Sequence, residues 1–83
     1  MHIEKELQNY IFNQFIPREN PKKFNIDDDL IEEGILDSLA IVHLITHLEE
    51  IYQIEVEAGE VVVDNIGSIR RLTDYIKHKL GSQ

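Results

Sequence analysis

The chain has 83 residues, with 16 acidic against 8 basic side chains and a formal net charge of −8. This length allows one small domain over residues 1–83 and no deep catalytic cleft, which favours a binding, adaptor or carrier role over an enzyme. The acidity disfavours nucleic acids and anionic membranes as partners and favours basic patches on other proteins. The charge fits a role in solubility alone equally well.

The sequence contains no cysteine, which excludes disulfides and thiolate chemistry and is compatible with the cytoplasm. Its first residues lack the basic and hydrophobic regions of a signal peptide, and its apolar stretches are far too short to span a bilayer. We therefore expect a cytoplasmic protein without membrane insertion, and we expect a monomer.

Residues 2–16 show the spacing of an amphipathic helix with one apolar stripe. The stripe consists of Ile3, Leu7, Tyr10 or Ile11, and Phe15. Pro17 ends this helix because proline lacks the N–H that a helix interior needs, and Pro21 indicates a loop.

Residues 17–36 form a long connection whose polar start, residues 18–23, indicates a surface segment. Large apolar residues follow among acids, namely Phe24, Ile26, Leu30 and Ile31. A connection of this kind has to lay those side chains on a core, so it is not a free linker. We expect a short turn over residues 28–33 that ends at Gly34.

A second long helix is predicted over residues 38–52. Asp37 or Ser38 could cap it, since a short oxygen-bearing side chain accepts hydrogen bonds from the free N–H groups of the first turn. The predicted core stripe comprises Ile41, Leu44, Ile45, Leu48 and Tyr52. Leu39, Val42 and Thr46 fall outside this stripe, and apolar residues left over near a helix start often meet a partner.

Residues 53–67 alternate β-branched and acidic side chains, which alone could indicate a strand. A lone strand would lack a partner in so small a helical chain, so we predict a loop with one short helical turn and a tight turn over residues 64–67. Ser68 then caps a last helix over residues 69–80, with Ile69, Leu72, Tyr75 or Ile76, and Leu80 on its apolar side. The elements predict an all-α four-helix bundle of three long helices and one short one, with a long first loop.

The triplet Asp37-Ser38-Leu39, at the start of a helix and after a loop that contains Gly34, resembles the acyl and peptidyl carrier protein family. The acidic end of the same helix and the pair Tyr75-Ile76 in the last helix are similar to that family too. The resemblance covers nearly the whole chain. It implies an acyl-carrier-like bundle that carries cargo between enzymes and is not itself an enzyme.

By this resemblance Ser38 is the attachment site of a covalent 4'-phosphopantetheine, which a phosphopantetheinyl transferase would move from coenzyme A onto the hydroxyl. A phosphodiester there would meet free N–H groups and the positive end of the helix dipole. No base stands out to activate Ser38, so the transferase has to supply the chemistry. From the residues alone, a serine in this place is more often only an N-cap.

The resemblance also implies that Asp37 and Leu39 flank the cofactor and that Asp37 contacts the transferase or its metal. The implied partner-facing surface comprises Leu39, Val42, His43, Thr46, Glu49 and Glu50, with Val56 from the next loop. Three alternatives stay open: Asp37 as a cap, Leu39 as a core residue, and the acids as a solvated helix end.

Three departures from the pattern of fatty-acid carriers narrow the predicted class of carrier. Two residues rather than one separate Gly34 from Asp37, His43 stands where an acid is common, and residues 64–69 resemble discrete peptidyl-type carriers. The longer spacing is similar to stand-alone carriers of aminoacyl or specialised acyl groups, including D-alanyl carriers. We predict a discrete carrier that takes an acyl or aminoacyl thioester from an adenylating or other acyl-loading enzyme to an accepting enzyme, in specialised metabolism or amino-acid activation.

Two alternatives to this function are a fatty-acid synthesis carrier and a carrier-like interaction module that is never modified and regulates a partner enzyme. The intact triplet around Ser38 argues against the unmodified interaction module, because a protein that is never modified has no need of the serine. We predict no metal site. The acids over residues 27–33 fail the calcium-loop pattern at Ile31. His43 and His47 lack an evident third ligand, so we expect solvated histidines.

Overall fold

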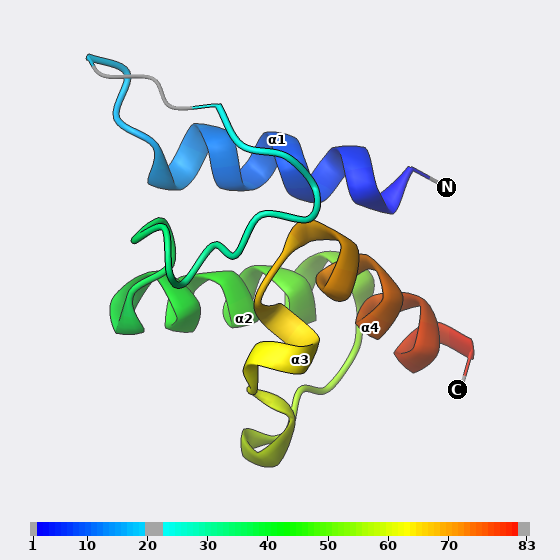
Figure 1. Cartoon of the computed structure of the whole chain (residues 1–83). Helices are drawn as coiled ribbons and strands as arrows, with labels where there is room; N and C mark the ends of the chain where they lie inside the picture. Colours follow the sequence, from blue (N-terminus) through cyan, green and yellow to red (C-terminus); the bar gives the residue numbers. More distant parts are fainter. Residues whose placement is uncertain (1, 20–22, 82–83) are drawn as a thin grey trace.

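The computed structural model describes residues 2–19 and 23–81. Over these ranges the chain forms helices and no strand: α1 (Ile3–Phe15), α2 (Ser38–Tyr52), the 3-10 turn η1 (Ala58–Glu60), α3 (Val63–Ile66) and α4 (Ile69–Gly81). The predicted all-α bundle of three long helices, one short helix and a long first loop is confirmed (Figure 1). Residues 20–22 of the predicted polar segment, Pro21 among them, lie outside the described ranges.

The helices α1 and α2 lie side by side and run in opposite directions (Figure 1). Near the start of α1, Glu6 accepts a hydrogen bond of 2.8 Å from the hydroxyl of Tyr52 at the end of α2. Further along α1, the Tyr10 ring stacks on His47. The C-terminal end of α1 therefore lies beside the N-terminal end of α2.

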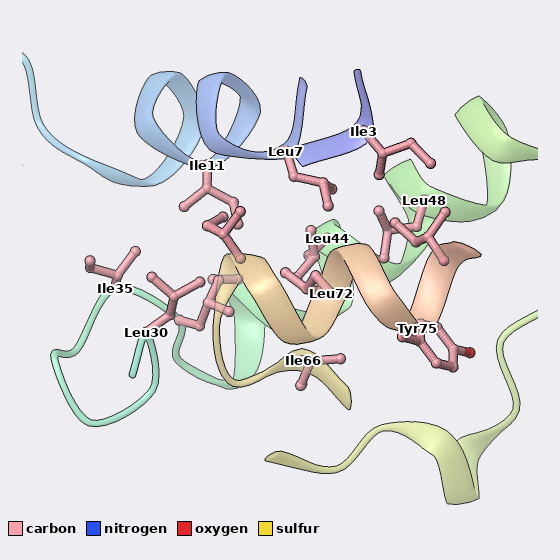
Figure 2. Close-up of a cluster of buried hydrophobic side chains, with 14 of the residues drawn as sticks. Ile3, Leu7, Ile11, Leu30, Ile35, Leu44, Leu48, Ile66, Leu72 and Tyr75 are labelled. Carbon is pink, nitrogen blue, oxygen red and sulfur yellow. The ribbon is translucent and has the colours of Figure 1, made fainter. Parts of the chain in front are cut away.

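One face of each long helix contributes to a single buried core, into which the first loop also inserts side chains (Figure 2). Its fully buried members are Leu7, Ile11, Leu30, Leu36, Leu44, Leu48, Ile66, Ile69, Leu72 and Ile76. Each such side chain contributes about 1.5–3 kcal/mol relative to an exposed one. The predicted role of the first loop, to lay apolar side chains on the core, is confirmed for Phe24 and Leu30, which are buried, and for Ile26, which packs partly on the core. It is wrong for Ile31, which is exposed, whereas Ile35 and Leu36 are buried as well.

The buried stripe of α2 is centred one residue earlier than predicted. Ala40, Leu44 and Leu48 are buried, whereas the predicted Ile41, Ile45 and Tyr52 are half-buried at the edge of the core. Ala40 is small, so its burial adds little to the apolar pattern by which the stripe was predicted. The spacing identified the correct side of α2 but placed its centre wrongly.

The first loop is fastened to the C-terminal half of the chain. The N–H of Leu30 donates to the carbonyl of Gly67 (2.8 Å), and the N–H of Arg70 donates to the carbonyl of Ile26 (2.9 Å). Arg70 also pairs through its guanidinium with Asp27. These bonds hold the loop, and with it the approach to α2, against the start of α4.

The segment between α2 and α4 differs in detail from its prediction. It contains two helical turns, η1 and α3, where one was expected, and the predicted tight turn over residues 64–67 lies mostly inside α3. A reciprocal cap between Glu57 and Glu60 closes η1, and Glu60 also accepts from Tyr75 (3.2 Å) and Lys79 (3.0 Å) on α4. Ser68 caps the first turn of α4 as predicted, with its hydroxyl accepting from the N–H of Arg71 (3.1 Å).

Candidate functional site

The start of α2 presents Ser38 at the surface. Ser38 is exposed and is the first residue of the helix. Asp37 is the N-cap, with extended backbone and a carboxylate oxygen that accepts from the N–H of Ala40 at 2.8 Å. Of the two predicted cap candidates, the structure therefore selects Asp37. The hydroxyl of Ser38 is therefore not needed for capping, and the residue is accessible from solvent.

The chain fixes Ser38 through the two residues that precede the cap. Ile35 and Leu36 are both buried, and both their N–H groups donate to the carbonyl of Leu30, at 2.9 and 3.0 Å. Gly34 makes this bend possible with φ of 78°, a left-handed conformation that side chains disfavour. The expected turn that ends at Gly34 is confirmed, and the exposed serine follows two buried residues that are hydrogen-bonded to this turn.

Two apolar side chains beside Ser38 are open to solvent. Leu39 is 67% exposed and Val42 is 61% exposed, so the alternative of Leu39 as a core residue is wrong. His43 and Thr46 are also exposed, and the Thr46 hydroxyl donates back to the carbonyl of Val42 (3.0 Å). These four residues cover the first half of α2 next to the serine.

The remaining residues of the predicted partner surface lie at the other end of α2 and in the loop that follows it. Glu49 is half-buried and accepts a hydrogen bond of 3.0 Å from the N–H of Val56, which packs partly on the core. Glu50 is exposed. At a rise of about 1.5 Å per residue, Glu49 lies about 17 Å along the helix from Ser38. The predicted surface therefore runs the length of α2, and Glu49 belongs to the fold as well.

A cavity of about 470 Å³ opens beside Ser38, between the end of α1 and the start of α2. Its lining comes from α1 (Tyr10, Gln14, Phe15), the first loop (Gly34, Ile35, Asp37) and α2 (Leu39, Ala40, His43). The contribution of α1 to this lining is not indicated by the sequence pattern. Tyr10 and Phe15 were assigned to the predicted apolar stripe, and no sequence signal links Gln14 to residues more than twenty positions away.

The two histidines of α2 have different surroundings. His43 is exposed, as expected, but the expectation of a solvated His47 is wrong, because its ring is half-buried against Tyr10. Burial lowers the pKa of His47, and the nearby charge of Glu50 opposes that effect. Burial likewise raises the pKa of the Tyr10 hydroxyl.

The acidic run over residues 27–33 is used for structure. A hydrogen bond from Arg70 lowers the pKa of Asp27. Asp28 accepts from the N–H of Asn25 (2.8 Å), and Asp29 accepts from two N–H groups of the following turn, each at 3.0 Å. In the described part of the chain, no group of three or more potential ligands is placed to hold a metal ion.

The surroundings of Ser38 fit a covalently attached arm. The hydroxyl is exposed, it stands at the positive end of a long helix, and polar and aromatic side chains line a cavity beside it. Asp37 already satisfies the N–H of Ala40, so modification of Ser38 would leave that cap intact. Within the described ranges, no helix is both long and apolar enough to cross a bilayer.

Comparison with known proteins identifies relatives. A family model described as a phosphopantetheine attachment site matches residues 12–76. A D-alanyl carrier protein of Abiotrophia defectiva is 31% identical over 58 residues, which cover 70% of this chain and 73% of the relative. A D-alanyl carrier protein of Streptococcus uberis is 33% identical over 51 residues, which cover 61% of this chain and 65% of the relative.

Proposed function

The chain belongs to the phosphopantetheine attachment site family and is a carrier protein with covalent 4'-phosphopantetheine, and on that premise we propose that Ser38 holds the arm and that the cargo is an aminoacyl group. The thiol at the end of such an arm holds an acyl group as a thioester. The protein itself positions the arm and presents it to enzymes.

One observation carries the assignment to Ser38. It is an exposed serine at the first position of a long helix, and the neighbouring Asp37 has taken over the capping role. An exposed hydroxyl that the fold does not use is available to a transferase. The residues before it are hydrogen-bonded to Leu30, and Leu30 to Gly67, which supports a defined position of Ser38 for successive partners.

The chain acts passively in this proposal. The transferase supplies the base that takes the proton of the Ser38 hydroxyl. The serine oxygen attacks the phosphorus on the pantetheine side of the coenzyme A pyrophosphate, so that the pyrophosphate bond breaks, the 4'-phosphopantetheinyl group is transferred to Ser38 and adenosine 3',5'-bisphosphate is released. Leu39 and Val42 offer apolar contacts to the transferase, to an adenylating enzyme that loads the cargo and to the enzyme that accepts it. Their exposure supports this role, because neither side chain contributes to the core.

Two observations support an aminoacyl cargo over a fatty acid. Both relatives described above carry D-alanyl groups, according to their names. The loop between Gly34 and Asp37 also has the longer spacing of stand-alone aminoacyl or specialised carriers. Amino-acid activation is therefore the proposed setting.

Intact mass spectrometry tests the attachment. Wild-type protein and Ser38→Ala are incubated with coenzyme A and a broad-specificity phosphopantetheinyl transferase, after circular dichroism has shown that both are folded. We expect the wild type to gain one phosphopantetheine group and Ser38→Ala to gain none. A gain by the alanine variant, or none by the folded wild type, would contradict the assignment.

The identity of the cargo is tested with protein that carries the arm but no acyl group. The modified protein is offered to a panel of amino-acid adenylating enzymes and, separately, to a malonyl transferase of fatty-acid synthesis. We expect a thioester-linked amino acid on the arm from one of the adenylating enzymes. Charging by the malonyl transferase alone would assign the chain to fatty-acid synthesis instead.

A further inference from the structure

The cavity beside Ser38 begins at the residues that flank the serine. Asp37 precedes Ser38, Leu39 and Ala40 follow it, and all three line the cavity. Ser38 itself does not line the cavity, so a group attached to its oxygen would reach this space by passing Asp37 or Leu39. The opposite wall, formed by Tyr10, Gln14 and Phe15, belongs to a helix that comes much earlier in the chain.

The lining combines two kinds of surface. Gln14, Asp37 and His43 supply an amide, a carboxylate and an imidazole, which can donate or accept hydrogen bonds. Tyr10 and Phe15 supply aromatic surface. A pantetheine arm also has polar and apolar parts, because two amides are separated by short methylene runs and one end carries a pair of methyl groups. The chemistry of the wall matches the chemistry of the arm.

The aromatic part of the wall is already ordered. Tyr10 and Phe15 meet edge to face with ring centroids 5.7 Å apart, and the other face of this cluster is closed by the stack of Tyr10 on His47. The Tyr10 hydroxyl also lies 3.5 Å from the carbonyl of His43 on α2. A preformed wall reduces the ordering cost that a bound group would have to overcome.

The volume of the cavity is compatible with a small occupant. Its volume of about 470 Å³ is within the range of small-molecule sites. Ile11 and Leu44, which follow the lining residues Tyr10 and His43 in the chain, are fully buried, so a long aliphatic chain that entered the core would have to displace packed residues. The space suits the arm with a small group at its end.

We propose that this cavity, which we call the α1–α2 cavity, is a resting site for the arm on Ser38, with Gln14 and His43 bonding its amides and the Tyr10–Phe15 pair contacting its apolar parts. The inference rests on the proposed attachment at Ser38. In the resting state the arm lies against α1, and a partner that binds Leu39 and Val42 draws it out. Gln14, Tyr10 and Phe15 then become part of the carrier function although they lie outside the attachment motif.

Nuclear magnetic resonance of the modified protein tests this proposal without any loading enzyme. The arm is introduced from isotope-labelled coenzyme A, complete modification of Ser38 is verified by mass, and isotope-filtered nuclear Overhauser effects are recorded between arm and protein. We expect contacts from the arm to the rings of Tyr10 and Phe15, and amide shift changes at Gln14 and His43. Gln14→Ala and His43→Ala should weaken these contacts. Asn13→Ala is the matched control, since Asn13 is exposed on α1 but does not line this cavity.

The outcomes separate the two proposals. Absence of mass gain at Ser38 in the folded protein overturns the attachment and the resting site together. Full modification with shift changes confined to residues 37–39 overturns the resting site alone, and so does an equal loss of contacts in the Asn13→Ala control. Changes at Tyr10 and Phe15 that appear only after an adenylating enzyme is added would assign the cavity to a side chain of that enzyme, which also overturns the proposal.

Discussion

Tyr10 of α1 and His47 of α2 stack face to face, with ring centroids 3.6 Å apart and ring planes inclined by 6°. The contact joins the two antiparallel helices on the side of the molecule where the α1–α2 cavity opens. It half-buries the imidazole, and this burial is the main reason why the pKa of His47 is lowered.

The stack makes stability depend on pH near the ordinary histidine pKa of 6.5. The folded pKa of His47 is lowered, so the unfolded chain binds the proton more readily, and this contribution to the free energy of unfolding falls as the pH drops through 6.5. His47→Phe keeps an aromatic ring but cannot titrate. Urea unfolding between pH 5 and 8 should show a smaller loss of stability on acidification for His47→Phe than for the wild type. Equal losses would contradict the role of His47.

Two substitutions of Asp37 distinguish its role as the N-cap of α2 from the role of its negative charge. Asp37→Ala removes the acceptor for the N–H of Ala40, which should lower the free energy of unfolding by about 1 kcal/mol. Asp37→Asn keeps a side-chain oxygen and should stay within about 0.5 kcal/mol of the wild type. We expect modification by the transferase to slow in both variants, as measured by intact mass over time. An Asp37→Asn protein modified at the wild-type rate would leave Asp37 with the capping role alone.

Leu39 and Val42 should matter for partners and not for stability. Both are more than 60% exposed, so Leu39→Ala and Val42→Ala should change the free energy of unfolding by less than about 0.5 kcal/mol. The kcat/KM for modification by the phosphopantetheinyl transferase should fall about fivefold or more, as expected when an apolar interface contact worth about 1 kcal/mol is removed. Ile51→Ala is the matched control, since Ile51 is 57% exposed at the opposite end of α2. A similar loss for Ile51→Ala would argue against a contact localised next to Ser38.

Gly34 is required for its backbone conformation and not for space. An added Cβ would have no atom within 4 Å, yet φ is 78°. Gly34→Ala should therefore lower the free energy of unfolding by about 1 kcal/mol. Gly59→Ala is the control, because its Cβ would also meet no atom within 4 Å and its φ is not positive. Chemical denaturation of both variants tests the difference, and an equally mild effect at the two sites would refute the argument from φ.

The sequence was sufficient to predict the long helices because each carries an apolar side chain on nearly every turn. It was insufficient for the segment between α2 and α4. The helix α3 has four residues, too few for a period to show, and it forms where Gly67 donates to the carbonyl of Val63 (2.8 Å). The centre of the α2 stripe was also wrong, since Ala40 contributes little to a hydrophobic pattern yet lies where the helices pack.

The candidate site was predictable in its motif and not in its surroundings. Ser38 and the exposure of Val42 follow from the start of one helix, which is local information. The contact of His47 with Tyr10 and the place of Gln14 in the cavity depend on the register of α1 relative to α2, that is, on which residues of the two helices lie opposite each other. The packing of the whole core determines this register, and the pattern of a single sequence does not reveal it.

The bonds between the first loop and α4 set a condition for recombining this carrier with a relative. A crossover placed after α2 would bring residues 26–30 of one parent against residues 67–70 of the other, at the bonds Leu30 to Gly67 and Arg70 to Ile26. The backbone bonds could survive such an exchange, but the Asp27–Arg70 ion pair requires both of its side chains. Chimeras that inherit these two short segments from the same parent should keep α2 in register. The two segments should therefore be exchanged together, although 36 residues lie between residue 30 and residue 67 in the chain.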